Sequence, residues 1–408
     1  MRKKWGTLAI VLSVVFVTAL SGCGSSASQS KDDATKADSG DGTIKLGIIT
    51  SLTGSGAEFG KDHERGYNLA LDEINQAGGV LGKKIELKIL DDKSSPEEAA
   101  KDVDQLVTQD KVQLLLGAYS SGSTLAVVKK ATEYKTPLIV PTAVAANITE
   151  TGSKYVFRIC ATSDSYATAV VNFLKDRPDA KTMAIIYEDG NFGTSSAESM
   201  KLALKDSGIK LIDEESYSVK NVDYKPMLQR VKAKNPDILY FASYSLDATA
   251  LMKQAHEIDL NANYFTAAGT GFSVATFTKD TGMEAEYTLA AGQWDPSATW
   301  NGSKEFDEKI FKLYNEHPSY HYMEAYAALY VAKAALEQAG EYNKDKIRDS
   351  LSKLQMDTAF GPIKFDEKGQ NNHPVIITQV QNGKFETVYP KEAASAEAKL
   401  PTPPWEKR

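Results

Sequence analysis

Hydroxyl side chains cluster where a predicted strand gives way to a predicted helix. The segment 114–124 reads LLLGAYSSGST and carries four of them: Ser120, Ser121, Ser123 and Thr124. The first turn of a helix leaves backbone N–H groups free, its dipole favours an anion, and hydroxyls add donors to a carboxylate. Ligands of open α/β sheets lie at the carboxyl ends of strands, so we predict carboxylate binding here. Alternatively, one of these serines is only the helix N-cap.

The same segment resembles a nucleophile elbow, A-x-S-x-G, in which Ser120 would attack an ester. A hydrolase would also need a histidine, and the chain has five: His63, His256, His317, His321 and His373. Of these, His373 follows two asparagines in a predicted loop and could in principle serve. A serine esterase is therefore a distant alternative, and we predict no catalytic residue.

Metal and dinucleotide sites are disfavoured by residue spacing. His317 and His321 are four residues apart, but Pro318 lies between them and no carboxylate recurs at metal spacing. Asp91 and Asp92 end a predicted strand as a ribose-binding acid would, yet no G-x-G-x-x-G precedes them. We therefore predict neither a metal nor a cofactor.

Aromatic side chains stand in predicted loops or just after predicted strands. They are Phe59, Tyr119, Phe192, Tyr244 and Trp294. Their faces can stack on an apolar side chain or hold an ammonium by cation–π attraction. Taken singly, each is an ordinary core residue, but together they indicate an apolar cleft.

Short β-branched runs alternate with amphipathic segments, as in parallel α/β folds. The first series has predicted strands at 44–50, 85–90, 112–116 and 137–140, with helices at 62–77, 96–109 and 122–133. The second begins after Arg158, with strands at 182–187, 210–217 and 238–242 and helices at 195–207, 225–233 and 246–258. Helices near 303–316, 320–339 and 344–354 precede strands around 363–365 and 375–381. Short crossovers require parallel pairing, so we predict two doubly wound, Rossmann-like lobes.

The N-terminus is typical of a lipoprotein signal peptide. Three basic residues at 2–4 precede the apolar run 8–20, and the sequence then reads LSGC up to Cys23. Because the run is too short for a permanent membrane span, we predict a signal peptide over 1–22 and lipid attachment at Cys23, with an uncleaved anchor as the alternative. The small polar residues after Cys23 predict a flexible tether over 23–42.

Composition narrows the possible partners. The net charge of −7 argues against a nucleic-acid-binding surface. Cys160 is the only cysteine besides Cys23, so an acylated Cys23 leaves no intrachain disulfide. The remaining chain, roughly 365 residues, is long enough for two lobes of ordinary size.

Several further short motifs occur along the chain in a specific order. They are LTG at 52–54, FG at 59–60, A-x-D-x-I-N at 70–75, GG at 78–79, DD at 91–92, the serine loop 120–124, P-x-x-x-P at 137–141, YEDGNFG at 187–193, AYAA at 325–328 and GPI-x-FD at 361–366. In order and spacing they resemble the type I periplasmic binding proteins, in the branch of the leucine/isoleucine/valine-binding proteins of ABC importers.

The resemblance implies two α/β lobes that are joined by three crossovers and close on a ligand between them. Lobe I would comprise 43–160 and 293–361, and lobe II 161–292 and 362–390, followed by a C-terminal tail at 391–408. The implied protein is a monomeric lipoprotein that delivers a small molecule to the permease subunits of an ABC importer. A lipid anchor suits a cell without an outer membrane, so we favour a Gram-positive surface over a periplasm.

Individual site residues carry over from the resemblance. The carboxylate-binding serine of the family falls on Ser121, and its partners after the next strand fall on Thr142 and Val144. The first-loop aromatic falls on Phe59 and the second-lobe tyrosine on Tyr244. Ala143 and Tyr166 complete the set that the resemblance implies.

Two positions depart from the leucine-type pattern. Val144 stands where a hydroxyl is usual, and Thr270 stands where an acidic group usually holds the α-ammonium. Asp189 or Asp247 could supply the missing acid, although Asp247 could equally be a helix N-cap. We expect a branched-chain or related hydrophobic amino acid as ligand, or else an aromatic or aliphatic carboxylate without an ammonium. A sensory receptor of the same fold would bind in the same way.

Overall fold

The computed structural model describes residues 42–408, apart from residues 221 and 301. The predicted signal peptide, Cys23 and nearly all of the predicted tether lie outside the described residues. Within these limits, none of the helices combines the length and the apolar character that a membrane crossing requires.

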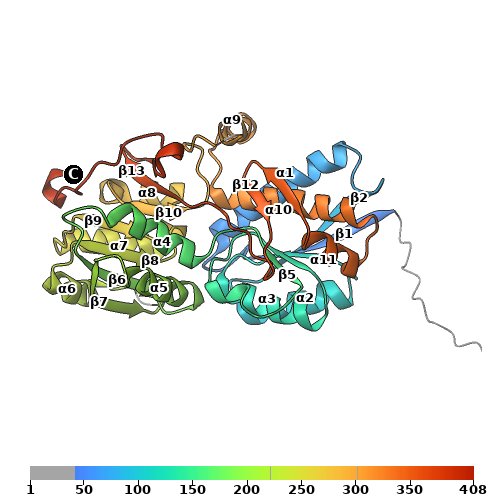
Figure 1. Ribbon diagram of the computed structural model, residues 1–408, viewed down its shortest axis with the longest axis horizontal. Helices are drawn as coiled ribbons and strands as arrows, with labels where there is room; N and C mark the ends of the chain where they lie inside the picture. The colour runs from blue at the N-terminus through green and yellow to red at the C-terminus, as the bar shows by residue number, and fades with distance from the viewer. Residues whose placement is uncertain (1–41, 221, 301) are drawn as a thin grey trace, which may run out of the picture. The chain divides into compact units, whose positions relative to one another are not determined.

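Lobe I is built on a five-stranded parallel sheet in the order β2-β1-β3-β4-β5 (Figure 1). Its strands are β1 (Thr43–Thr50), β2 (Lys84–Asp91), β3 (Leu115–Gly117), β4 (Leu138–Val140) and β5 (Val156–Arg158). Its helices are α1 (Ala57–Gln76), α2 (Pro96–Thr108), α3 (Ser121–Glu133), α10 (Tyr320–Ala339) and α11 (Lys344–Leu351). Alternate strand residues point to opposite faces: Leu114 and Leu116 pack in one core cluster with α1 and α10, and Leu115 in another with α2 and α3.

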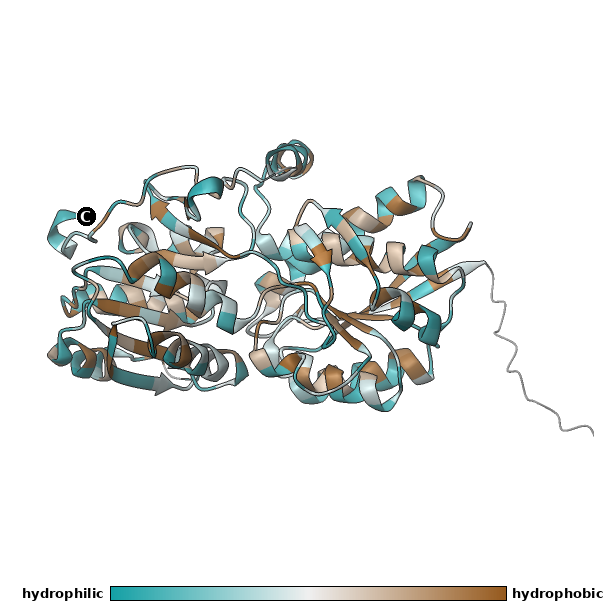
Figure 2. Cartoon of the chain, viewed as in Figure 1, coloured by the Kyte–Doolittle hydropathy of each residue, from teal (hydrophilic) through white to brown (hydrophobic). Residues whose placement is uncertain are grey.

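Lobe II is built on a seven-stranded sheet in the order β14-β13-β10-β9-β8-β6-β7. Its strands are β6 (Thr182–Glu188), β7 (Lys210–Tyr217), β8 (Ile238–Ala242), β9 (Tyr264–Ala267), β10 (Leu289–Gly292), β13 (Ile376–Gln381) and β14 (Lys384–Tyr389). Its helices are α4 (Ser163–Leu174), α5 (Asn191–Leu204), α6 (Lys225–Lys234), α7 (Ser245–Glu257) and α8 (Ala275–Thr281). β13 and β14 run antiparallel, and the other pairs are parallel. Figure 2 shows apolar central strands in both sheets, in line with their burial on both faces.

The chain passes between the two lobes three times. The first crossover follows β5, the second follows β10 and leads to α9 (Ser303–Tyr314), and the third follows the hairpin of β11 (Gln355–Thr358) and β12 (Gly361–Lys364). Ile363 and Phe365 pack in the core cluster of α1 and α10. The third crossover therefore comes after Phe365, later than the boundary suggested by the sequence.

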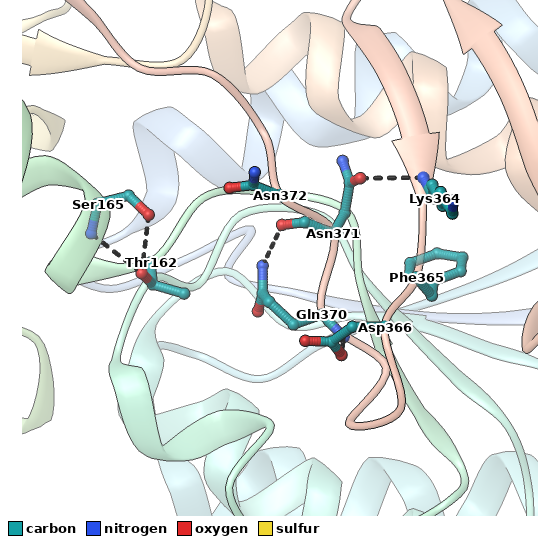
Figure 3. Close-up of a pocket in the computed structure, with 8 residues that line it drawn as sticks. All are labelled: Thr162, Ser165, Lys364, Phe365, Asp366, Gln370, Asn371 and Asn372. Atoms are coloured by element: carbon teal, nitrogen blue, oxygen red, sulfur yellow. Dashed lines mark hydrogen bonds between the residues drawn. The ribbon is translucent and has the colours of Figure 1, made fainter.

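A hollow of about 410 Å³ lies beside the first and third crossovers (Figure 3). It is lined by Thr162, Ser165, Lys364, Phe365, Asp366, Gln370, Asn371 and Asn372. Much of this polar lining is bonded to itself: Asn371 Oδ1 accepts from the Lys364 N–H over 3.0 Å, and Gln370 Nε2 donates to the Asn371 carbonyl over 2.6 Å. None of the predicted ligand-binding residues lines this hollow.

The C-terminal segment 391–408 packs on lobe II. Trp405 is buried, and its indole Nε1 donates to the Leu260 carbonyl over 2.7 Å. Its ring stacks on His256 at 5.0 Å and meets Phe265 edge-on at 5.3 Å. The end of the chain is thus part of the lobe II core.

Candidate ligand site between the lobes

The serine loop joins β3 to α3, as predicted. Gly117 has φ +126°, and a Cβ on it would lie 2.1 Å from the Ile49 carbonyl oxygen, so only glycine fits this strand end. Ser120 is the N-cap of α3, and its hydroxyl accepts from the Ser123 N–H over 3.2 Å. Buried Ser121 has a different partner, because its Oγ accepts from the Ala145 N–H over 3.3 Å. The capping role thus belongs to Ser120, whereas Ser121 bridges two loops at the carboxyl end of the sheet.

None of the five histidines is hydrogen-bonded to Ser120. The serine–histidine pair that an esterase needs is therefore not formed. His63 and His321 belong to a buried network described below. His256 pairs with Glu284 and His317 with Asp307. His373 is buried against the Pro374 and Phe360 carbonyls.

Four of the five predicted aromatic residues meet in a chain of ring contacts that runs from lobe I to lobe II. Phe59 stacks on Tyr119 with ring centroids 4.7 Å apart, and Tyr119 lies 6.2 Å from Tyr244. Tyr244 in turn lies 5.3 Å from Phe192. The fifth, Trp294, lies apart from this chain and packs edge-on to Phe306. It lines a cavity of about 870 Å³ together with Glu58, Tyr320 and residues of α8 and α9.

Four tyrosines converge where the lobes meet: Tyr119, Tyr166, Tyr244 and Tyr320. Burial, reinforced by neighbouring phenols and carboxylates, raises the pKa of the Tyr119, Tyr166 and Tyr244 hydroxyls well above the usual range. The Tyr320 hydroxyl accepts from the Thr270 N–H over 3.1 Å. The buried Tyr119 hydroxyl has no hydrogen-bond partner among the described residues. Protonated phenols at this position are donors that a ligand oxygen can accept from.

Thr142 belongs to a buried polar network. Its hydroxyl donates to Glu324 over 2.7 Å and lies 2.7 Å from His63 Nε2. His63 Nδ1 lies 3.1 Å from the Thr50 hydroxyl, and His321 Nδ1 lies 3.2 Å from Glu324. Burial raises the pKa of Glu324 well above its usual range and lowers that of His63 to about 3. The imidazole of His63 is therefore neutral, as a fully hydrogen-bonded interior group should be.

The network extends to two crossovers. Gln293, after β10, donates from Nε2 to Glu324 over 2.9 Å, and its Oε1 accepts from the Ala161 N–H over 2.5 Å. Glu324 is completely buried. One carboxyl group thus connects the loop after β4 with the first and second crossovers.

His63, His321 and Glu324 also form a group whose potential metal-ligand atoms all lie within 4.8 Å of one another. Glu324 lies three residues after His321 on the same helix face and was not among the predicted site residues. Thr142 lies between His63 and Glu324 and bonds to both. Those hydrogen bonds account for both groups without an ion.

Neither predicted acid is hydrogen-bonded to one of these four tyrosines. Asp189 is exposed. Asp247 is buried, but its carboxylate accepts from the Tyr224 hydroxyl over 2.8 Å inside lobe II. Burial raises the pKa of Asp247. Asp247 is thus already hydrogen-bonded to Tyr224, and Asp189 lies at the surface.

The predicted residues Ala143 and Val144 lie in the loop after β4. Val144 packs in the lobe II core cluster that contains Tyr166 and Phe192. The Ala143 carbonyl accepts from Arg158 over 3.1 Å. Val144 is a lobe I residue in a lobe II cluster, so the two lobes are in contact here.

Hydrogen bonds between the lobes come from residues that sequence reasoning missed. Glu58, at the start of α1, accepts from the Ser245 hydroxyl over 3.1 Å and from the Thr276 hydroxyl, both in lobe II. The Ser195 hydroxyl accepts from the Ala146 N–H over 3.0 Å. Glu58 stands one residue before the predicted Phe59, and this proximity was the only signal for it. These hydrogen bonds thus join the two lobes directly.

Comparison with known proteins agrees with this architecture. A family model described as "Periplasmic binding protein" matches residues 43–384. The chain belongs to this family. As a periplasmic binding protein it is a solute-binding protein and not an enzyme, as predicted, and its two-lobed α/β fold is the one expected.

Among the relatives of this periplasmic binding protein, a "Leu/Ile/Val-binding protein homolog 7" from Brucella suis is 30% identical over 377 residues, 88% of this chain and 94% of the relative. The structure of a branched-chain amino acid transporter substrate binding protein from Streptococcus pneumoniae, in complex with isoleucine, has a TM-score of 0.78 and 27% identity, covering 88% of this chain and 100% of that one. A solute binding protein from Rhodopseudomonas palustris, in complex with 3,4-dihydroxy benzoic acid, has a TM-score of 0.78 and 22% identity, covering 90% and 100%.

Proposed function

We propose that this periplasmic binding protein is the solute-binding component of an ABC importer and captures a branched-chain or related hydrophobic amino acid by lobe closure. The observation that carries the proposal is the ring chain from Phe59 through Tyr119 to Tyr244, which crosses between the lobes beside the serine loop. The names of the Brucella and Streptococcus relatives support the ligand class.

The chemistry of the site divides between its two sides. The ligand carboxylate would lie at the first turn of α3, where Ser121 and free backbone N–H groups offer donors to an anion. The apolar side chain would lie among Phe59, Tyr119, Tyr244 and Phe192. Contacts made by both lobes favour the closed form, so binding energy is converted into closure, which a permease can recognise.

A second candidate is a hydrophobic carboxylate without an ammonium, and the acids favour it. Thr270 is uncharged, Asp189 is exposed, and Asp247 is bonded to Tyr224. An ammonium buried without a partner is costly. The fold accommodates both kinds of ligand, since solved relatives hold isoleucine or a dihydroxybenzoate.

The same proposal covers location and partners. Cys23 would carry the lipid that holds the protein at the outer face of the cytoplasmic membrane, with residues 24–42 as a tether. Such tethering keeps a monomeric binder at high local concentration near its permease. We favour a Gram-positive cell surface, where a free protein would be lost.

A thermal-shift screen tests the proposal. Branched-chain and aromatic amino acids are each compared with their deaminated analogues at increasing concentration. A midpoint that rises with ligand concentration marks a binder. No rise with any member of either series would reject the proposed ligand class, and a rise with only the deaminated series would select the second candidate.

A further inference from the structure

Four carboxyl side chains are buried among the described residues: Asp92, Glu188, Asp247 and Glu324. Three of them serve their own lobe. Asp92 accepts from the Ser51 hydroxyl and from the Ser94 N–H in lobe I. Glu188 accepts from the Gly190 and Gly193 N–H groups at the start of α5, and Asp247 accepts from Tyr224. Glu324 alone of the four bonds to a residue of the loop after β4, Thr142, and to a crossover residue, Gln293.

His321 stands between Glu324 and the aromatic residues of the site. Its Nδ1 lies 3.2 Å from Glu324, and its ring lies 3.9 Å from that of Tyr320, 4.8 Å from that of Phe59 and 5.4 Å from that of Tyr119. The His321 side chain is almost completely buried. Its Nε2 is buried and has no hydrogen-bond partner among the described residues. A buried ring nitrogen beside two tyrosines of the site thus has unused hydrogen-bonding capacity.

The orientation of His321 fixes what Nε2 can do. A histidine that donates from Nδ1 to a carboxylate is a neutral imidazole with Nε2 as an acceptor, unless it holds a second proton. Burial, with His63 nearby, lowers the pKa of His321 well below its usual range, so the second proton is disfavoured. The His321–Glu324 pair then offers an acceptor backed by a carboxylate, the chemistry that suits a cation.

This inference rests on the proposed function. We propose that Glu324 orients His321 so that its Nε2 accepts a hydrogen bond from the ammonium of an α-amino acid ligand. The pair supplies on lobe I the acidic group that Asp189, Asp247 and Thr270 do not supply on lobe II. Glu324 acts through His321 and is a positioning residue.

This mode of binding is coupled to the release of a proton. Burial raises the pKa of Glu324 and so favours the protonated form of its carboxyl when no cation is nearby. An incoming ammonium favours the carboxylate, so binding of a zwitterion releases this proton, and affinity rises with pH until Glu324 ionises unaided. The ionisable groups that face Glu324 from its neighbours are His63, Tyr67, Tyr119, Cys160, Tyr166, Tyr320 and His321. Burial raises the pKa of Tyr119, Tyr166 and Cys160, so these groups stay protonated.

The test pairs two variants with two ligands. His321→Asn keeps a donor to Glu324 but removes the atom at the Nε2 position, whereas His321→Gln places an amide oxygen near that position. Calorimetry with L-leucine and with 4-methylpentanoate, which lacks the amino group, measures both affinities. We expect His321→Asn to weaken leucine binding at least about ten-fold and 4-methylpentanoate binding less than about three-fold, and His321→Gln to retain most of the leucine affinity. Wild-type protein should release a proton with leucine only, which titrations in two buffers of different ionisation enthalpy reveal.

Each contrary result is distinct. Equal losses for both ligands would assign His321 a structural role and overturn the inference, and so would unchanged leucine affinity. Binding of 4-methylpentanoate but not leucine by the wild type would overturn the inference and leave the importer role intact. If the wild type binds neither these ligands nor any other hydrophobic amino acid, the proposed function itself is rejected, and the inference is rejected with it. Far-UV circular dichroism of each variant shows whether it is folded.

Discussion

Thr142 donates a hydrogen bond to Glu324 over 2.7 Å, and this bond joins the loop after β4 to α10. Glu324 also accepts from Gln293, which in turn accepts from the Ala161 N–H. The loop beside the serine site and two of the three crossovers therefore share one buried network. A movement of that loop on ligand binding would be transmitted directly to the crossovers, where lobe closure takes place.

The two adjacent serines of the loop should behave differently. Ser121→Ala removes a hydroxyl beside the proposed carboxylate position and should weaken ligand binding by about 1–3 kcal/mol. Ser120→Ala removes the N-cap of α3 and should lower the free energy of unfolding by about 1 kcal/mol with little change in affinity. Calorimetry and urea denaturation measure the two effects. Identical affinity for wild type and Ser121→Ala would exclude this serine from the site.

Glu58 should stabilise the closed form. It accepts hydrogen bonds from Ser245 and Thr276 of lobe II, so Glu58→Ala should weaken ligand binding by about 1–2 kcal/mol without lowering the stability of either lobe. Glu98→Ala is the matched control, since Glu98 pairs only with lysines of lobe I. If both variants bind ligand as tightly as wild type, Glu58 does not hold the lobes together.

Arg158 should be intolerant of lysine. It is fully buried and donates to the Ala143 and Ala145 carbonyls, to Thr149 and to Gln370. Lysine cannot reproduce this planar set of donors, so Arg158→Lys should reduce the free energy of unfolding by about 2–4 kcal/mol in urea denaturation. Arg230→Lys, at an exposed ion pair with Glu215, should cost less than about 1 kcal/mol. Similar costs for the two variants would contradict the role assigned to Arg158.

Asp62 should make stability depend on pH. Burial raises the pKa of its carboxyl to about 6 in the folded state, from an ordinary value of 3.8. A carboxyl with a raised pKa stabilises the fold below about pH 4, and this contribution is lost as pH rises through 6. The stability of Asp62→Asn relative to wild type should therefore be greater at pH 7 than at pH 4, by up to about 3 kcal/mol.

The control for Asp62 is Asp206→Asn, at an exposed position. Its stability relative to wild type should change little between the two pH values. Urea denaturation at pH 4 and pH 7 measures both variants. A pH-independent difference for Asp62→Asn would show that Asp62 titrates normally.

Periodicity located most of the elements but missed others, among them two four-residue strands and helix α4. The strand at 210–217 and the helix at 320–339 have the predicted bounds in the structure. β9 (YFTA) and β10 (LAAG) have four residues each, too few to show a period, and were missed. The helix α4 was missed although Thr162 caps it. Helices α1 and α5 begin earlier than predicted, because Gly56 and Gly190 at their N-caps offer no side-chain signal.

The site was predictable where it lies next to a strand end and unpredictable where it depends on contacts distant in sequence. Phe59, Tyr119 and Tyr244 follow predicted strands, so their convergence could be expected. The link from Thr142 to Glu324 spans 182 residues, and no local pattern encodes it. Tyr320 was placed in a predicted helix without a site role, and His321 was considered only as a metal ligand or as the histidine of an esterase. Ser120 and Ser121 are neighbours with the same side chain, and only the structure separates their roles.

The central claim is that the lobes close on a hydrophobic amino acid. Small-angle X-ray scattering of the purified protein, alone and with saturating L-leucine, L-isoleucine or L-valine, tests it most directly. The account predicts a radius of gyration that decreases on addition of at least one of these amino acids and that decreases less in Glu58→Ala. An unchanged radius of gyration with every one of them, at concentrations that saturate binding by calorimetry, would contradict closure as the mechanism.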